Sequence, residues 1–222
     1  MVCHALKAVT GTLSLIGISV GGNITLKYLG EESSTIPTRI RAAIAVSVPC
    51  DLRSSAEKLA QPSNAIYMQY LLRPLRARMR EKALRFPGLF DLSGLDSITT
   101  FREFDSRFTA PMHGFSSVDE YWETSSSRLF IPRIAIPTLL VSALDDPFLS
   151  PSCFPLTLAE EMDLLFLETP AHGGHVGFIS SLNLSRTWLE HRAVTFLSEK
   201  HPLRLSNELL ENRVGNGDTP RS

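Results

Sequence analysis

The stretch LIGISVGGN at residues 15–23 decides how the rest of this 222-residue chain is interpreted. Its apolar start is typical of a buried strand, and Gly17, Ser19 and Gly21 then follow at two-residue spacing. A G-x-S-x-G turn between strand and helix holds its serine in a strained backbone conformation, so that the hydroxyl stands clear of the sheet. We expect a side chain at either flanking glycine to strike the neighbouring strand or helix. The motif makes Ser19 a candidate nucleophile and the Val20 amide a candidate oxyanion donor.

A serine hydroxyl needs a base before it can act as a nucleophile at neutral pH, and two later segments offer one. The segment SALDDPF places Asp145 and Asp146 after an apolar run, and PAHGGHVGF places His172 and His175 in a glycine-rich loop. Taken singly, Asp-Asp-Pro is typical of a turn and a histidine between glycines is typical of a surface loop. Because the order is Ser, Asp, His and each group follows a predicted strand, we expect all three at one sheet edge, as a catalytic triad.

Apolar runs alternate with helical patterns along much of the chain. The helical pattern after Ser19 ends at Gly30, which we expect to be its C-cap. Strands alternating with helices predict an α/β fold with a mostly parallel sheet of about four strands, flanked by helices. The expected strands cover 13–18, 41–49, 137–147 and 163–170, and later helices cover 153–162 and 184–199.

Residues 51–131 carry helical patterns and no convincing strand, so we expect a helical insertion within a core formed by residues 1–50 and 132–200. The polar tail at 201–222 is expected to be disordered. In FREFDSRF, residues 101–108, four charged side chains are expected to pair with one another: Arg102, Glu103, Asp105 and Arg107.

Six basic residues cluster within the insertion, and two interpretations apply to them. The more common interpretation is a helix face exposed to solvent, and the more specific one is peripheral docking on an anionic membrane. The cluster comprises Arg73, Arg76, Arg78, Arg80, Lys82 and Arg85.

Composition excludes several classes of function. The formal net charge of −1 provides no positive field that would attract nucleic acid. The sequence contains no run of 18 apolar residues, so no membrane span is predicted. Three separated cysteines (Cys3, Cys50 and Cys153) form no C-x-x-C pair, which favours a reducing, cytoplasmic location. Metal-ligand spacings and phosphate-binding loops are missing from the sequence, so no cofactor and no metal are predicted.

Several segments together resemble the YheT-like branch of the α/β-hydrolases, which includes esterases and phospholipase-like proteins. The matching segments are GISVGGNITLKYLGE (17–31), FREFDSRFTAPMHGF (101–115), YW (121–122), PTLLVSALDDPF (137–148), HGGHVGF (172–178) and WLEHRAVTFL (188–197). The resemblance implies an α/β-hydrolase fold with Ser19 as nucleophile, His175 as base, Asp146 as acid with Asp145 a close second, and the Val20 amide in the oxyanion hole.

The same resemblance implies that residues 51–131 form a lid over an acyl pocket. Four lid residues either face an acyl chain or, more commonly, pack the lid itself: Tyr67, Tyr70, Leu71 and Phe90. Family members carry further strands and an H-G loop with a second oxyanion donor before the serine turn, whereas 16 residues precede Gly17 here. We therefore expect an incomplete, N-terminally truncated fold whose 13–18 strand is an exposed edge prone to self-association.

The leading hypothesis is a serine hydrolase that acts on carboxylic esters or lipids with short to medium acyl chains through an acyl-enzyme. The alternative is a catalytically impaired fragment that serves as a binding or interaction module. An amidase uses the same triad and stays open, because leaving-group preference depends on pocket shape.

Overall fold

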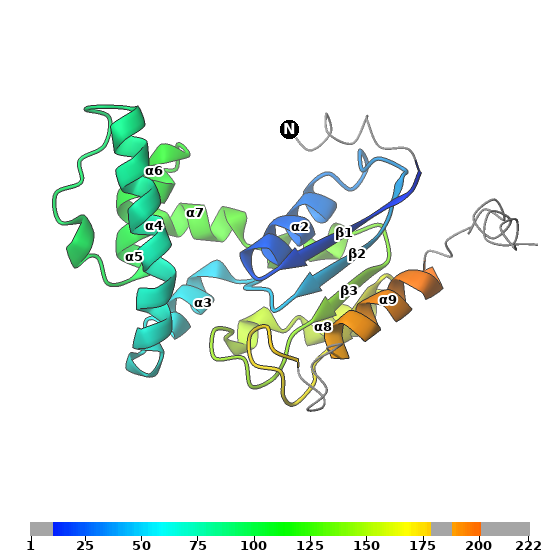
Figure 1. Ribbon diagram of the computed structural model, residues 1–222. Helices are drawn as coiled ribbons and strands as arrows, with labels where there is room; N and C mark the ends of the chain where they lie inside the picture. The colour runs from blue at the N-terminus through cyan, green and yellow to red at the C-terminus, as the bar shows by residue number, and fades with distance from the viewer. Residues whose placement is uncertain (1–10, 179–187, 201–222) are drawn as a thin grey trace, which may run out of the picture.

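A computed structural model describes residues 11–178 and 188–200, arranged around a parallel sheet (Figure 1). Its strands lie in the order β1-β2-β3-β4, and every neighbouring pair is parallel. Their bounds are Leu13–Ile18 for β1, Ile40–Val46 for β2, Thr138–Val141 for β3 and Leu165–Glu168 for β4. The α/β class and the four predicted strands are confirmed, because each observed strand falls within or overlaps one apolar run.

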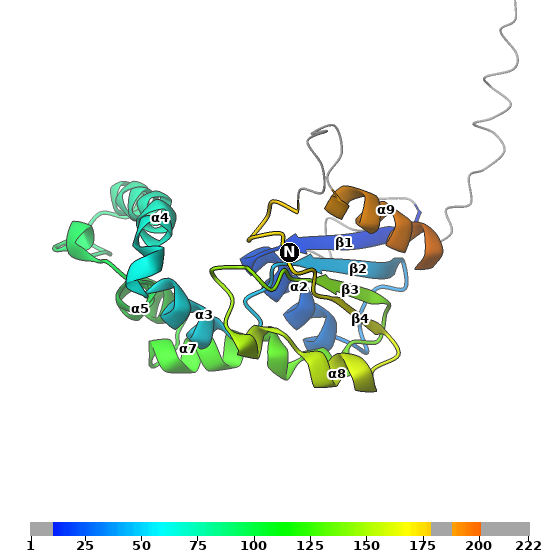
Figure 2. The ribbon, with the colours of Figure 1, turned by 90° about the horizontal axis from the view of Figure 1, so that it is seen from below.

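Helices cover both faces of the sheet (Figure 2). On one face lie α2 (Val20–Glu31) and α8 (Leu156–Glu161), and Leu26 and Leu29 of α2 are buried against Ala43 and Ala45. On the other face lies α9 (Trp188–Lys200), whose Phe196 joins a cluster with Ala42, Ile44 and Leu139. Successive residues of β2 point to opposite faces, so a strand buried on both sides must be apolar throughout.

Gly30 is not the C-cap that the sequence predicts. Helix α2 continues to Glu31 and is capped by Glu32, while Gly30 is buried within the helix. A Cβ atom at Gly30 would collide with the carbonyl group of Phe130. The glycine therefore allows α2 to pack closely against the chain that returns to β3.

Between β2 and β3 the chain leaves the sheet and forms a helical insertion beyond the carboxyl ends of the strands (Figure 1). The insertion has its own core, which includes Met68, Leu72, Phe104 and Phe108. Its helices are α3 (Leu52–Leu59), η1 (Pro62–Asn64), α4 (Ala65–Arg85), η2 (Leu95–Ser97), α5 (Phe101–Phe104), η3 (Asp105–Thr109), α6 (Ala110–Met112), α7 (Val118–Ser125), η4 (Ser127–Leu129) and η5 (Ile131–Arg133). One more short helix, η6 (Pro151–Cys153), follows β3.

The expectation that the charges of FREFDSRF pair with one another is wrong. Arg102 pairs with Asp119, and Arg107 pairs with Asp91. Glu103 completes the N-terminal capping box of α5 with Thr100. Asp105 begins η3, a π-helix, and accepts its hydrogen bonds from uncharged groups. The π-turn alters the spacing of Asp105 and Arg107 only, while Arg102 in α5 meets its partner through the fold of the insertion, which the spacing in the sequence does not reveal.

Strand β1 lies at the edge of the sheet. Among the described residues no strand pairs with its outer side. Its residues Ile16 and Ile18 remain 59% and 51% exposed, which is unusual for isoleucines of a parallel sheet. The edge therefore combines unpaired backbone groups with exposed apolar side chains.

Part of the basic cluster is used within the insertion. Arg76 donates a hydrogen bond to the Ile98 carbonyl, and Arg80 pairs with Asp96. Docking on a membrane surface stays a prediction. Within residues 11–178 and 188–200, no helix is both long and apolar enough to cross a membrane. The predicted disordered tail at 201–222 lies outside the described residues.

Candidate active site

Ser19 occupies the turn between β1 and α2, with backbone angles of φ 54° and ψ −124°. A non-glycine residue rarely adopts a positive φ, and such strain is held only where surrounding contacts fix the chain. One such contact is the Ser19 amide, which donates to the Val46 carbonyl of β2 at 2.7 Å. The strained turn directs the serine side chain away from the strand and toward the loops at the sheet edge.

The glycines around Ser19 differ in how much space a Cβ atom would have. A Cβ atom at Gly17 would lie 2.5 Å from Thr25 Oγ1 and would also collide with the Gly21 carbonyl. A Cβ atom at Gly22 would lie 2.5 Å from a methyl group of Val48. At Gly21 no heavy atom of the described chain lies within 4 Å of that position. The expectation that a side chain would collide is therefore confirmed at Gly17 and is wrong at Gly21. A side chain would also collide at Gly22, which is not part of the G-x-S-x-G motif.

A continuous line of hydrogen bonds joins three side chains from distant parts of the chain. His175 Nε2 lies 2.9 Å from Ser19 Oγ, and His175 Nδ1 lies 2.8 Å from Asp146 Oδ2. The Asp146 side chain is fully buried, and the His175 side chain is 15% exposed. A carboxylate, an imidazole and a hydroxyl in this order form the arrangement that activates a serine.

The neighbouring pair, Asp145 and His172, lies apart from this line. Asp145 Oδ1 accepts hydrogen bonds from the backbone amides of Gly173 and Gly174, at 3.0 and 2.8 Å. The amide of Gly174 is the largest cause of a lowered pKa at Asp145. His172 lies 3.3 Å from Asp145 and its side chain is 92% exposed. Asp145 thus shapes the loop that carries His175, while Asp146 contacts the imidazole itself.

Phe148 also supports the imidazole, and the sequence gives no clear signal for it. Its ring lies 4.4 Å from the His175 ring between centroids, and its amide donates to Asp146 Oδ1 at 2.9 Å. On its other side it packs edge-on against Tyr67 of α4 at 5.0 Å. Phe148 therefore connects the loop after β3 with the helical insertion.

Val20 opens helix α2 directly after the serine. Amides in the first turn of a helix have no carbonyl partner within the helix, and the helix dipole favours negative charge there. A role for the Val20 amide as an oxyanion donor stays a prediction, and the position of Val20 at the first turn of α2 is compatible with it. Its side chain is 55% exposed and lines the cavity next to Ser19.

A cavity of about 1440 Å³ opens between the sheet edge and the insertion, and Ser19 and His175 both line it. Its walls are mostly apolar, with Ile24 from α2, Leu59 from α3 and Leu75 from α4 among them. Such a volume is larger than the usual several hundred Å³ of a small-molecule pocket. It can receive both an acyl chain and a bulky second group.

The four lid residues considered from the sequence behave differently. Leu71 lines the cavity. Tyr70 is 76% exposed, Tyr67 packs on Phe148, and Phe90 packs within the insertion. Tyr67 and Phe90 therefore follow the commoner interpretation, Leu71 follows the other one, and Tyr70 follows neither.

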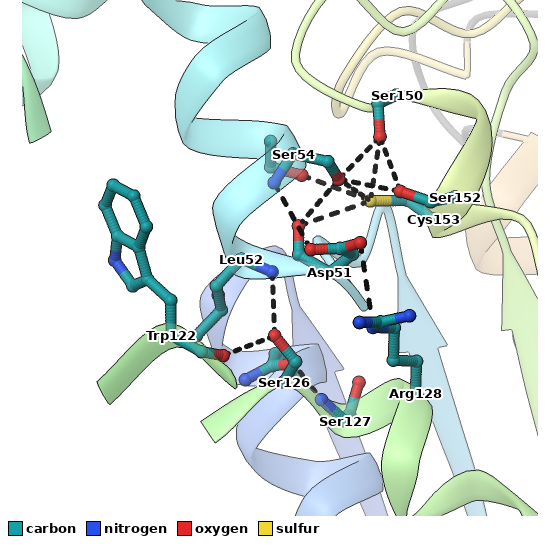
Figure 3. A network of polar contacts seen from close by, with 12 residues as sticks. Asp51, Leu52, Ser54, Trp122, Ser126, Ser127, Arg128, Ser150, Ser152 and Cys153 are labelled. Carbon is teal, nitrogen blue, oxygen red and sulfur yellow. Dashed lines mark hydrogen bonds and ion pairs between the residues drawn. The ribbon is translucent and has the colours of Figure 1, made fainter. Parts of the chain in front are cut away.

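At the base of the insertion its two connections to the sheet are bonded to each other (Figure 3). The Leu52 amide donates to Ser126 Oγ at 3.0 Å, and Arg128 pairs with Asp51 at 3.6 Å (Figure 3). Ser54 at the start of α3 also contacts Ser150, in the loop after Asp146, at 2.7 Å (Figure 3). These contacts fix the insertion relative to the loop that carries Asp146.

Asn23 is a further residue that sequence reasoning missed. It lies one turn after Ser19 in α2 and is 3% exposed. Its side-chain amide donates to the Ser125 carbonyl at 2.9 Å and accepts from the Ser127 amide at 2.8 Å. Both partners lie toward the C-terminal end of the insertion, so Asn23 bonds helix α2, which follows Ser19, to the insertion. A polar residue within an apolar helical pattern is the available signal for it.

Two buried cysteines lie beside this base and carry free thiols. Burial raises the pKa of the Cys50 thiol to about 12, so it stays protonated at neutral pH. The Cys153 sulfur lies 3.1 Å from Ser55 Oγ. Within the described ranges no group of three His, Cys, Asp or Glu side chains is arranged to hold a metal ion.

Comparison with known proteins assigns this chain to a protein family. Residues 10–182 match the model of the family described as "alpha/beta hydrolase fold". The YheT protein of Escherichia coli (strain K12), an esterase by name, is 34% identical over 82% of this chain and 54% of its own length. Phospholipase ABHD3 of Mus musculus is 31% identical over 75% of this chain and 40% of its own length.

Two further matches are more distant. Monoacylglycerol lipase ABHD2 of Homo sapiens is 28% identical over 83% of this chain and 47% of its own length. The solved structure of the acylaminoacyl peptidase of Pyrococcus horikoshii has a TM-score of 0.50 and 16% identity, over 90% of this chain and 26% of that chain, and indicates the fold alone. The chain spans about half the length of the curated relatives it matches.

Proposed function

Because this chain belongs to the alpha/beta hydrolase fold family and to its YheT-like branch, we propose that it is a serine hydrolase of carboxylic esters with short to medium acyl chains. Relatives named as esterases and lipases support a hydrolase in general terms. The observation that carries the finer proposal is the line of contacts from Ser19 through His175 to Asp146, at 2.9 and 2.8 Å.

The reaction begins when Ser19 Oγ attacks the ester carbonyl carbon. His175 Nε2 accepts the hydroxyl proton, and Asp146 holds the imidazole through Nδ1 and stabilises its positive charge. The Val20 amide donates to the oxyanion that forms on the carbonyl oxygen. Collapse of this intermediate breaks the ester C–O bond, and the leaving alcohol takes the proton from His175.

The second half of the reaction releases the acid. Water attacks the acyl-enzyme, gives its proton to His175, and the carboxylic acid leaves as Ser19 regains its proton. An alcohol that enters in place of water forms a new ester by the same steps. The apolar cavity and the helical insertion above Ser19 favour binding of an acyl chain and limit access of bulk water.

Hydrolysis of p-nitrophenyl butyrate tests the proposal, with Ser19→Ala and His175→Asn as variants that remove nucleophile and base. We expect turnover by the full chain and losses of several orders of magnitude in both variants. Far-ultraviolet circular dichroism serves as the control for folding. Equal turnover by Ser19→Ala and the unaltered chain would contradict the proposal.

A second candidate function, an interaction module without turnover, is favoured by the edge of β1, which no other described strand covers, and by its exposed Ile16 and Ile18. Such an edge pairs readily with another polypeptide. The two candidates differ in oligomeric state and turnover. A folded monomer that hydrolyses p-nitrophenyl butyrate would exclude the interaction module.

A further inference from the structure

The lining of the cavity beside Ser19 contains a carboxylate that the proposed mechanism does not use. Asp105 lines the cavity together with Ser19 and His175. It lies at the start of the π-helix η3, and π-turns within helices are frequent at functional sites. The side chain is partly buried, so the cavity is its route to solvent or to a ligand.

Two protein groups use part of the hydrogen-bonding capacity of this carboxylate. Thr109 Oγ1 donates to Oδ1 at 2.6 Å, and Trp122 Nε1 donates to Oδ2 at 2.9 Å. A carboxylate offers about four acceptor sites, so about two of them stay available toward the cavity. Both donors are neutral, and neither compensates the negative charge.

The basic side chains closest in sequence make their ion pairs elsewhere. Arg102 stacks over the Trp122 ring at 4.8 Å but pairs with Asp119, and Arg107 pairs with Asp91. Burial raises the pKa of Asp105. Burial also raises the pKa of Tyr121, and the charge of Asp105 adds to that rise. At Asp105 the effect of burial outweighs the hydrogen bonds from Thr109 and Trp122, which lower the pKa.

The remaining lining residues repeat this excess of negative charge. Three carboxylates line the cavity, those of Glu31, Glu32 and Asp105, against one ammonium group, that of Lys27. Lys27 pairs with Glu31 at 2.9 Å. Among the described lining residues, Glu32 and Asp105 therefore have no ammonium partner, and the other basic side chains of the lining are the imidazoles of His113 and His175.

Several aromatic residues line the same cavity as Asp105, and Trp122 among them donates to its carboxylate. The lining includes Phe101, Phe104, Phe115, Tyr121 and Trp122. Ring faces attract cations, most strongly when the cation has lost its water, and quaternary ammonium groups are commonly bound by aromatic cages. A carboxylate beside several rings combines the two kinds of attraction for the same ligand group.

We propose that Asp105 and the aromatic residues around it form a subsite for an ammonium group on the ester substrate. The inference deepens the proposed function by naming a substrate class, namely esters that carry a quaternary or protonated amine. Ser19 and His175 act on the carbonyl group, while the ammonium group lies against Asp105 in the same cavity. A neutral ligand with a hydroxyl group could donate to the free acceptor sites of Asp105, but it would gain no attraction from the excess negative charge.

The test measures binding in place of turnover, so that it does not depend on the proposed catalysis. The full chain carrying Ser19→Ala is titrated by calorimetry with hexanoylcholine and with 3,3-dimethylbutyl hexanoate. These two esters differ only in a trimethylammonium group that replaces a tert-butyl group of the same shape. We expect hexanoylcholine to bind about ten-fold more tightly.

Adding Asp105→Asn to this variant is expected to reduce the affinity ratio of the two esters to about one. Adding Asp96→Asn removes a carboxylate of the insertion that does not line the cavity, and it is expected to keep the ten-fold ratio. The proposal is overturned if the neutral ester binds as tightly as the charged one to Ser19→Ala. It is also overturned if the ratio survives in Asp105→Asn.

Discussion

His175 Nδ1 lies 2.8 Å from Asp146 Oδ2, and the Asp146 side chain is fully buried beneath the imidazole. The residue before it, Asp145, instead accepts the amides of Gly173 and Gly174 in the loop. Two adjacent carboxylates therefore have different tasks, one at the imidazole and one in the loop backbone. This division yields a matched pair of variants.

Asp146→Asn is expected to lower kcat for ester hydrolysis by about 10⁴-fold, because the amide no longer fixes the imidazole tautomer or stabilises its positive charge. Asp145→Asn keeps the carboxylate at the imidazole and is expected to lose far less activity. Steady-state kinetics on p-nitrophenyl butyrate measure both. An equal loss of kcat in the two variants would show that the contact between Asp146 and His175 does not account for the activity.

Gly17 and Gly21 give a second matched pair, this time for stability. A Cβ atom at Gly17 collides with the Gly21 carbonyl, and a Cβ atom at Gly21 points into open space among the described residues. We expect Gly17→Ala to lower the free energy of unfolding by about 1–3 kcal/mol. Gly21→Ala is expected to be neutral or slightly stabilising, because alanine favours a helix. Urea unfolding followed by circular dichroism distinguishes them, and similar midpoints would refute the steric explanation.

The exposed side chains of β1 predict concentration-dependent self-association. Replacing Ile16 and Ile18 with lysine places charge on the sheet edge, a change that opposes pairing of edges. We expect the double variant to sediment with a lower weight-average mass than the unaltered chain in analytical ultracentrifugation. Val194→Lys, at a 65% exposed position on α9, is the control and should not lower it. Unchanged association in the double variant would mean that another surface is responsible.

Asp105 predicts a pH-dependent stability with a definite sign. Burial raises its pKa in the folded protein above the usual 3.8, so the carboxylate destabilises the fold once the pH exceeds the folded pKa. Below pH 3.8 both the folded and unfolded states are protonated, and the penalty disappears. Asp105→Asn should therefore raise the melting temperature at pH 7 and give a smaller gain as the pH falls toward 4. A gain that grows on acidification would contradict the raised pKa.

The strands and the main site residues could be predicted because their signals are local and strong. Continuous apolar runs such as that of β2 have few alternatives to a buried parallel strand. The motif around Ser19 and the loop around His175 carry glycines that mark turns at strand ends. Sequence order then suggests that both lie at the same edge of the sheet.

The features that escaped prediction depend on packing between distant segments. Gly30 is glycine because the Phe130 backbone lies against it. Glycine is also common just after the last turn of a helix, so the sequence alone suggests a C-cap, whereas the observed cap is Glu32. Of the charged residues of FREFDSRF, Arg102 and Glu103 lie in α5 and Asp105 and Arg107 lie in the π-helix η3, and their partners Asp119, Thr100 and Asp91 come from outside the segment. Asp105 reaches Trp122, 17 residues further along the chain, through a fold of the insertion that no local pattern encodes.

The central claim is that Ser19 is a nucleophile activated by His175 and Asp146. Reaction of the full chain with a fluorophosphonate, followed by intact mass and peptide mapping, tests it most directly. We predict one covalent adduct, located on Ser19, that is missing from Ser19→Ala and forms much more slowly in His175→Asn. An unlabelled chain, or a Ser19→Ala variant labelled as fully as the unaltered protein, would contradict the claim.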